Sequence, residues 1–548
     1  MIQNPILPGF HPDPSIIRVK DDYYVVTSSF EWLPGLPLYH SKDLVHWRHV
    51  ANLLKNKKQI DMTGEKPSRG VWAPALDYDE NTGRFYLVYS NVHSQTKSFF
   101  DVDNFLMWTD DILGEWSDPI YLNSSGFDPS PFIDDDGSFW LVNKDRDFRP
   151  QNIDKRAIVL QRYDFDKKCL AGEPVVISRG VTERRFVEGA HLFKKDGFYY
   201  LIAAEGGTGY GHAVTLARSK TITGPYEPSP YGVVLTSQPK EFTATEQTPF
   251  MMPEQYNPGS ELQKSGHGSL VETASGEWYM AHLCGRPVMP EMRCILGRET
   301  ALQKMMWTED GWLRMADGSC LAKSQVPAPR LPEHPFPPEN PVCEFDSKTL
   351  PLYFCTPRNE ITPEWAEIRP EESCLLLRGQ ESLSSYYKVS LLARRLTSLQ
   401  AEATTLLKYE PTHYHHLAGV TCYYDCESHF CLYKTFDEVK KQEVLAAYAF
   451  EHNEMRVIGE PIPVEKGAAV WLRMKAEGGN LLMLYSLDGE NYRLFGEKQG
   501  LTVLSDEYSR CGCFTGTFVG VFAQDTHTKS KWARFDWFQY EDLPGKAR

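Results

Sequence analysis

Three carboxylic acids and one histidine share a position relative to a repeated aromatic residue. Asp128, Glu188 and His267 each stand 12 residues before such an aromatic, and Asp13 stands 11 residues before one. Cleavage of a glycosidic bond needs two carboxyl groups held apart, one protonated to donate to the leaving oxygen and one ionised to act on the sugar or on a water. A third carboxylate near the acid raises its pKa by like-charge repulsion. The pattern therefore indicates glycoside hydrolysis.

The strands that must position these side chains can be recognised from a repeated sequence pattern. A turn followed by an aromatic-rich, apolar strand occurs five times between residues 21 and 281. Such turns suit tight hairpins, and a second hairpin-like pattern follows three of the copies. Successive aromatics are 62, 54, 60 and 79 residues apart, which fits one four-stranded blade each and predicts a five-bladed β-propeller. The equivalent aromatics are Tyr24, Tyr86, Trp140, Tyr200 and Tyr279.

Residues just upstream of each hairpin should lie on the innermost strand of a blade, where equivalent residues meet around the propeller axis. Pro74 holds this position in the second repeat. A lone Asp-Pro is more often a turn former, a lone histidine a core residue, and a lone glutamate a solvated strand end. A repeated hairpin in a β-sandwich would have a shorter period. The shared spacing favours a common site, because like charges crowded at an axis are costly without a task.

The chain is predicted to form two all-β domains. Residues 1–322 hold the repeats and form the propeller. Residues 323–341 are rich in proline, which predicts a semi-rigid linker. Residues 342–548 alternate apolar and polar side chains around turns such as Asp488-Gly489, which predicts an antiparallel β-sandwich of jelly-roll type.

Composition excludes several classes of function. The 548 residues carry a formal charge of −15 and no long basic run, which argues against nucleic acid as a partner. The N-terminus does not resemble a signal peptide and no apolar run reaches membrane-spanning length, so we expect a cytoplasmic protein without membrane contact. The twelve cysteines are then expected to be thiols, because neither a disulfide framework nor a strong zinc pattern fits.

Eight short stretches of the N-terminal region resemble glycoside hydrolase family 43, and within it the two-domain β-xylosidases. They occur in the family's order, which makes the set more specific than any single motif, and residues 512–520 resemble the family's C-terminal sandwich. The eight stretches begin at Asn4, Gly70, Ser125, Val187, Ala204, Gly266, His282 and Leu296.

The resemblance implies an exo-acting, inverting β-xylosidase that releases xylose from the non-reducing ends of short β-1,4-xylo-oligosaccharides. Asp13 would be the general base that activates water, and Glu188 the general acid. Asp128 would orient Glu188 and tune its pKa. Because the family inverts configuration, Asp13 and Glu188 are expected roughly 6.5–9.5 Å apart.

The resemblance also implies a pocket for the terminal sugar, in which aromatic faces pack on the ring and Arg286 adds hydrogen bonds and a positive field. His267 would lie beneath the sugar and hold a water or, through it, a hydrated cation such as Ca²⁺, although no cofactor is required. Phe514, chosen over Phe518, would close the mouth and so explain exo action. The expected pocket residues are Phe30, Trp72, Phe127, Thr208, His267, Arg286 and Phe514.

Alternatives remain open at this point. An α-L-arabinofuranosidase or a bifunctional enzyme would use the same carboxylates on an arabinoside, whereas the sandwich would obstruct the open groove of an endo-arabinanase. A non-catalytic sugar-binding protein is disfavoured because all three carboxylates are present. The family suggests a homo-oligomer, either dimer or tetramer. Arg184 and Arg185, together with the long segment 238–263 near the pocket or a subunit contact, leave the leaving-group specificity open.

Overall fold

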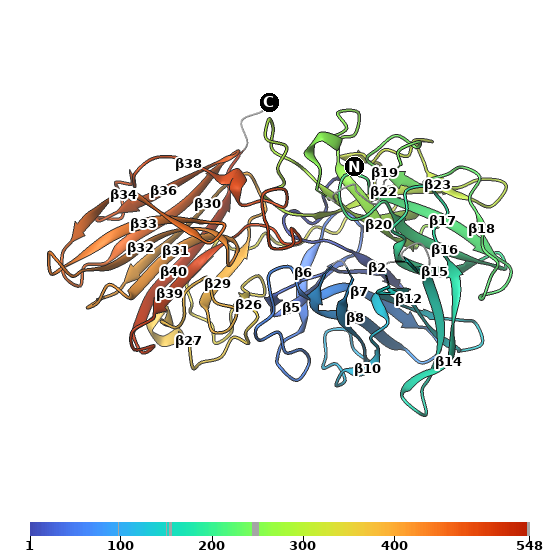
Figure 1. The fold of residues 1–548 in the computed structure, drawn as a ribbon, viewed down its shortest axis with the longest axis horizontal. Helices are drawn as coiled ribbons and strands as arrows, with labels where there is room; N and C mark the ends of the chain where they lie inside the picture. The colour runs from blue at the N-terminus through green and yellow to red at the C-terminus, as the bar shows by residue number, and fades with distance from the viewer. Residues whose placement is uncertain (97, 150, 153–155, 244–250, 545–548) are drawn as a thin grey trace.

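The computed structural model describes residues 1–96, 98–149, 151–152, 156–243 and 251–544, and it confirms the all-β prediction. A propeller and a sandwich lie side by side, with the chain running from blue to green in the first and from yellow to red in the second (Figure 1). The described residues include no helix long and apolar enough to cross a membrane. Residues 244–250 of the long segment 238–263 lie outside the described residues.

Five sheets radiate from the propeller axis, and each predicted hairpin supplies the first two strands of one sheet. Every sheet is antiparallel, and β19 (Leu235–Thr236) adds to the fourth by pairing with β17. The blades are β2 (Ser15–Val19), β3 (Asp22–Val26), β5 (Gly35–Ser41), β6 (Arg48–Leu54); β7 (Gly70–Asp79), β8 (Arg84–Gln95), β9 (Phe100–Thr109), β10 (Ile120–Asn123); β11 (Gly126–Ile133), β12 (Phe139–Asp145), β13 (Ile158–Asp164), β14 (Cys169–Ser178); β15 (Glu188–Lys195), β16 (Phe198–Glu205), β17 (Ala213–Ser219), β18 (Glu227–Pro228); and β20 (Gln263–Glu272), β21 (Trp278–Gly285), β22 (Glu299–Trp307), β23 (Leu313–Met315).

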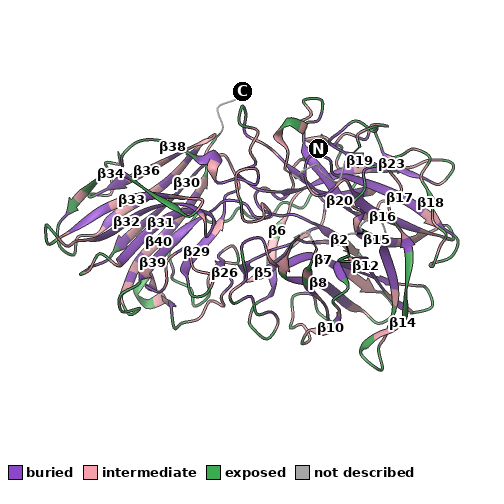
Figure 2. Ribbon diagram, in the orientation of Figure 1, coloured by how far each residue is buried: buried purple, intermediate pink, exposed green. Residues whose placement is uncertain are grey.

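Burial differs between the strands of the blades. The inner strands β7, β11 and β20 are mostly buried. The outer strand β14 is largely exposed (Figure 2). Hydrophobic clusters fill the wedges between neighbouring blades, as where Leu38 of the first blade meets Leu87 of the second. Radial packing of this kind hides strand edges and leaves the first residues of the inner strands around the axis.

The ring is closed by the N-terminal segment. β1 (Ile2–Gln3) pairs with β24 (Gln325–Val326), which follows the fifth blade. The Asn4 side chain donates from Nδ2 to the carbonyls of Leu302 and Lys323, and its Oδ1 accepts from Leu302 N. Residues far apart in sequence are therefore joined where the first and last blades meet.

The second domain is a sandwich of a nine-stranded and a six-stranded antiparallel sheet around a large apolar core. The first sheet holds β25 (Val342–Cys343), β27 (Ala366–Arg369), β28 (Cys374–Arg378), β30 (Gln400–Lys408), β35 (Val470–Glu477), β36 (Asn480–Ser486), β37 (Arg493–Leu494), β38 (Gln499–Gly500) and β40 (Trp532–Asp542). The second holds β29 (Ser390–Arg395), β31 (His416–Asp425), β32 (Ser428–Asp437), β33 (Gln442–Glu451), β34 (Glu454–Val464) and β39 (Phe518–Asp525).

The two domains interlock. β4 (Trp32–Leu33) of the propeller pairs with β26 (Thr356–Pro357). Trp32 stacks on Phe518 with ring centroids 3.6 Å apart and donates its indole N–H to Thr515 Oγ1 at 3.1 Å. This contact fixes the loop before β39 against the propeller, beside the start of the inner strands.

Asn4→Ala tests the ring closure. The change removes three hydrogen bonds to partly buried backbone groups, so we expect the free energy of unfolding to fall by about 2–3 kcal/mol. Denaturant titration would measure it, with Asn491→Ala, in an exposed turn, as the control. Equal stability of the two variants would show that this closure contributes nothing.

Candidate active site

Each inner strand begins with the same backbone distortion. In every blade the residue four positions before the strand partner of the repeated aromatic has a positive φ. In blades 2 to 5 the strand register shifts at this residue, as in a β-bulge, which re-aims side chains beside active sites. The five residues are Asp13 (φ 54°), Ala73 (φ 38°), Asp128 (φ 54°), Gly189 (φ 55°) and His267 (φ 51°).

The structure corrects the predicted alignment of the blades at two positions, those of Pro74 and Glu188. The common position belongs to Ala73 and Gly189, so Pro74 lies one residue after it and Glu188 one residue before it. In the fourth blade the reason is steric, because a Cβ on Gly189 would come within 2.9 Å of His267 Nδ1. The neighbouring residue therefore supplies the carboxylate, and Gly189 N–H donates instead to Asp128 Oδ2 at 2.9 Å.

Asp13 is buried among donors. Ser28 Oγ donates to Asp13 Oδ2 at 2.7 Å, and Arg298 Nη1 donates to Oδ1 at 3.4 Å. His267 Nδ1 lies 3.5 Å from the same Oδ1. Arg298 Nη1 also donates to Thr208 Oγ1 at 2.7 Å, which fixes the guanidinium over Asp13. A carboxylate held in this way is positioned to accept a proton from a water.

Asp128 and Glu188 lie close enough for their charges to interact. Burial raises the pKa of Asp128 well above its usual range, and the charges of Glu188 and Asp13 raise it further. Burial also raises the pKa of Glu188, opposed by the charge of Lys144. Because each charge disfavours ionisation of the other group, the pair retains a proton at a pH where an isolated carboxylic acid has lost it.

Lys144 was missed by the sequence analysis. It stands at the end of β12, and its Nζ donates to the carbonyl of Val187, directly before Glu188. Burial lowers the pKa of Lys144 to about 8, although the charge of Glu188 raises it. The signal that could have found it is the repeat itself, since the second strand of each hairpin ends at the same side of the propeller as the first begins.

Aromatic rings surround the charged groups. Trp72 lies 5.4 Å from Phe30, 5.9 Å from Phe127 and 5.5 Å from Phe514, between ring centroids. Phe514 also lies 6.0 Å from Phe30, and the Arg298 guanidinium lies 5.2 Å from its ring. Phe518, by contrast, is fully buried against Trp32 in the domain interface. Phe514 is therefore the sandwich residue that the structure places with the expected pocket aromatics.

Arg286, expected to line the sugar pocket, forms an ion pair with Glu299. Its Nε and Nη2 donate to Glu299 at 2.6 and 2.8 Å, and Glu299 also accepts the N–H of Gly9. The guanidinium beside Asp13 is that of Arg298, which is 2% exposed. Both arginines flank the connection between β21 and β22, so their sequence positions did not decide between them.

His267 lies beside the carboxylates, as expected, but the calcium expected near it finds no support. Among the described residues no group of three or more histidine, cysteine, aspartate or glutamate side chains could hold a metal ion. Burial lowers the pKa of His267, partly opposed by the charge of Asp13. The twelve cysteines are free thiols.

Comparison with known proteins accords with this geometry. Residues 2–313 match the family model described as Glycosyl hydrolases family 43, and residues 342–541 match that described as Beta xylosidase C-terminal Concanavalin A-like domain. The chain belongs to glycosyl hydrolase family 43. It is 40% identical to Xylosidase/arabinosidase 43B of Humicola insolens (99% of this chain, 98% of that one) and 39% identical to Beta-xylosidase of Bacillus subtilis strain 168 (99% of each).

Among solved structures, xylan beta-1,4-xylosidase from Bacillus halodurans C-125 superposes with a TM-score of 0.92 at 46% identity, covering 99% of this chain and 100% of that one. Family membership confirms that this chain is a glycoside hydrolase, and that its propeller is followed by the family's sandwich domain.

In this family 43 enzyme a buried charge cluster fixes the loop that carries Phe514. Lys264, three residues before His267, contacts Asp506 at 3.1 Å and Glu507 at 2.5 Å, and all three side chains are essentially inaccessible. Glu507 Oε2 also accepts from Cys294 N at 2.7 Å. The cluster thus clamps the sandwich loop onto the segment that leads to Arg298.

Lys264→Met would leave two buried carboxylates without their cation. We expect the free energy of unfolding to fall by about 3–5 kcal/mol, the usual cost of breaking a buried pair. Adding Asp506→Asn and Glu507→Gln should restore much of this loss, because no unpaired charge is then buried. Lys194→Met, which breaks a more exposed pair, should cost less than about 1 kcal/mol. Chemical denaturation would measure all three, and a Lys264→Met loss no larger than that control would contradict the clamp.

Proposed function

We propose that this chain is an exo-acting, inverting β-xylosidase that releases xylose from the non-reducing ends of short β-1,4-xylo-oligosaccharides. The proposal rests on one observation: the surroundings of Asp13 differ from those of Asp128 and Glu188. Asp13 accepts from Ser28 and Arg298, whereas burial and mutual repulsion favour a retained proton on Asp128 and Glu188. An ionised base and a protonated acid are the two groups that glycoside hydrolysis requires. The names of the Bacillus relatives support the substrate class.

The reaction follows from these assignments. Glu188 donates its proton to the glycosidic oxygen as the bond from the anomeric carbon to that oxygen breaks. Asp13 accepts a proton from a water as the water's oxygen bonds to the anomeric carbon from the opposite face, which inverts configuration. Asp128 accepts the Gly189 N–H and so holds the backbone beside Glu188. The reaction needs no cofactor in this scheme.

The exo mode is supported by the place of Phe514. This side chain comes from the sandwich yet packs on Phe30 and Trp72 of the propeller. A wall contributed by the second domain blocks passage of a long chain through the site, so that only a chain end fits. We also propose a homo-oligomer, dimer or tetramer, which analytical ultracentrifugation would test.

A second activity, on terminal α-L-arabinofuranosides, is favoured by one observation. The Humicola insolens relative named Xylosidase/arabinosidase 43B is 40% identical over 99% of this chain. The same three carboxylates would serve both substrates, because neither substrate adds a charge to the pocket. The ratio of kcat/KM values for xylobiose and an aryl α-L-arabinofuranoside would separate the two functions.

Proton NMR of xylobiose hydrolysis tests the main proposal. We expect α-xylose to appear first, and Asp13→Ala to lose most activity on both xylobiose and 4-nitrophenyl β-D-xyloside. Glu188→Ala should lose about 10²–10⁴-fold on xylobiose but far less on the nitrophenyl substrate, whose leaving group needs no proton. Initial release of β-xylose would overturn the inverting mechanism, and an intact xylobiose would overturn the substrate assignment.

The pH profile tests the acidic pair. Glu188 must be protonated, so kcat/KM should fall as pH rises through the ionisation of the pair. Lys144→Met removes the cation that opposes the effect of burial on the pKa of Glu188, and we expect the alkaline limb to move to higher pH by about one unit. Lys194→Met, near the far end of β15, is the matched control. An unmoved limb would exclude this role for Lys144.

A further inference from the structure

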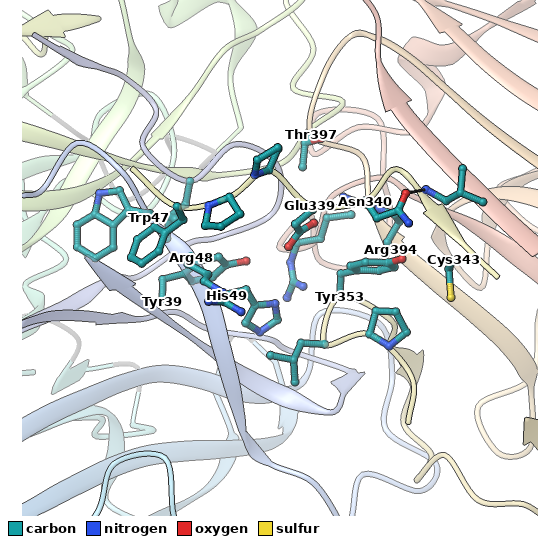
Figure 3. A pocket seen from close by; sticks show the side chains of 18 of the residues that line it. Tyr39, Trp47, Arg48, His49, Glu339, Asn340, Cys343, Tyr353, Arg394 and Thr397 are labelled. Carbon is teal, nitrogen blue, oxygen red and sulfur yellow. Dashed lines mark hydrogen bonds between the residues drawn. The ribbon is translucent and has the colours of Figure 1, made fainter. Parts of the chain in front are cut away.

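A cavity of about 910 Å³ lies between the two domains, apart from the three carboxylates (Figure 3). Its walls come from the N-terminal segment and first blade of the propeller, from the linker, and from the sandwich. Trp47, Tyr353 and several prolines give it apolar surfaces, and Arg48, Arg394 and Arg395 give it cationic ones. The volume lies within the range of small-molecule sites.

Arg395 at the end of β29 is a buried cation without a counterion. The residue is 7% exposed, its Nε donates to the Phe10 carbonyl at 2.7 Å, and its guanidinium lies 5.9 and 5.5 Å from the rings of Phe10 and Phe518. Among the described residues no carboxylate forms an ion pair with it. A buried charge without a partner is costly, and this one lines an open cavity.

Arg394 presents a second cation to the same space. Its guanidinium lies between two rings, 4.3 Å from that of Tyr353 and 4.1 Å from that of Tyr540. It too forms no ion pair with a described carboxylate. A guanidinium stacked between rings keeps the N–H groups on its edge free for a planar acceptor such as a carboxylate.

The other titratable groups at the base do not supply a negative charge. Burial, and then the charge of Arg395, lowers the pKa of His49 to about 4, and burial lowers that of His11 as well. Both rings are therefore neutral near pH 7. Tyr39 donates to or accepts from His11 Nε2 at 2.7 Å and stacks on His49 at 4.9 Å. The base of the cavity is thus a neutral polar surface around one cation.

The acidic side chains among the described lining residues are Glu339, Glu344 and Asp346, which are all exposed to solvent. Burial raises the pKa of Tyr39 and Tyr353, and the charge of Glu339 raises it further. The carboxylate oxygens, together with Asn340 and the hydroxyl of Tyr353, accept hydrogen bonds from hydroxyl groups. The cavity therefore combines the guanidinium groups of Arg394 and Arg395 with oxygens that can bind hydroxyl groups and with apolar walls of the size of a sugar ring.

We propose that this interdomain cavity binds a carboxylated sugar, a hydroxylated ring with one acid group, with the carboxylate on Arg394 and Arg395. The site is separate from the catalytic pocket, whose three carboxylates would repel an anion. It does not depend on which glycoside the enzyme cleaves.

Isothermal titration calorimetry of the full chain with D-glucuronate tests the proposal. We expect one site per chain with a millimolar or lower Kd, weakened at high salt and unaffected by Glu188→Gln. Arg394→Met should weaken binding at least about tenfold, the effect of losing one charge-assisted contact. Arg395→Met should do the same. Arg395 packs on Phe10 and Phe518, so replacing it could unfold the protein. Arg394 is only half-buried, so its variant tests the proposal even if the Arg395 variant does not fold.

Controls define the chemistry. Arg493→Met, at an exposed arginine in the sandwich, should leave glucuronate binding unchanged. D-Xylose, which has no acid group, should not compete for the site, whereas sulfate should compete weakly. No binding at about 10 mM glucuronate, or equal binding to wild type and Arg394→Met, would overturn the proposal. Competition by xylose as strong as by glucuronate, or sulfate binding as tight as that of glucuronate, would also overturn it.

Discussion

Three carboxylic acids held close together at the propeller axis repel one another, and nearby cations offset part of that repulsion. Arg298 donates to Asp13, and the charge of Lys144 acts on Glu188. The repulsion that remains between the carboxylates favours a proton retained by the pair of Asp128 and Glu188. The asymmetry required for acid and base roles thus arises from the surroundings of each carboxyl group: Asp13 accepts from Ser28 and Arg298, whereas burial raises the pKa of Glu188 and of Asp128.

The propeller alone brings the acids together, but it does not complete the pocket. Phe514 comes from a loop of the sandwich, and its backbone N–H donates to Ser68 Oγ at 3.0 Å. The same loop packs on the residues before Arg298, where a Cβ on Gly297 would lie 2.3 Å from the Thr515 carbonyl. The second domain therefore shapes the site by holding both an aromatic wall and the guanidinium over the base.

Buried charged groups are stabilised in different ways at three places in this molecule. In the clamp, Lys264 is matched by Asp506 and Glu507. In the active site, a surplus of carboxylates is relieved by protonation. At the base of the interdomain cavity, Arg395 has contacts with a carbonyl and with rings but no described carboxylate. The last case is the one in which the folded chain leaves a charge open to a ligand.

The repeat, the number of blades and the common position of Asp13, Asp128 and His267 could be predicted from the amino-acid sequence, because hairpin spacing and strand alternation are local properties. The same spacing included Glu188, the proline-rich stretch 323–341 separated the second domain, and the family motifs added the roles of the residues. Only the tertiary structure decided that Gly189 takes the shared position, because His267 of another blade leaves no room for a Cβ. It likewise showed that Arg298 donates to Asp13, while Arg286 donates to Glu299. Such choices depend on contacts between distant segments, which no spacing within one segment encodes.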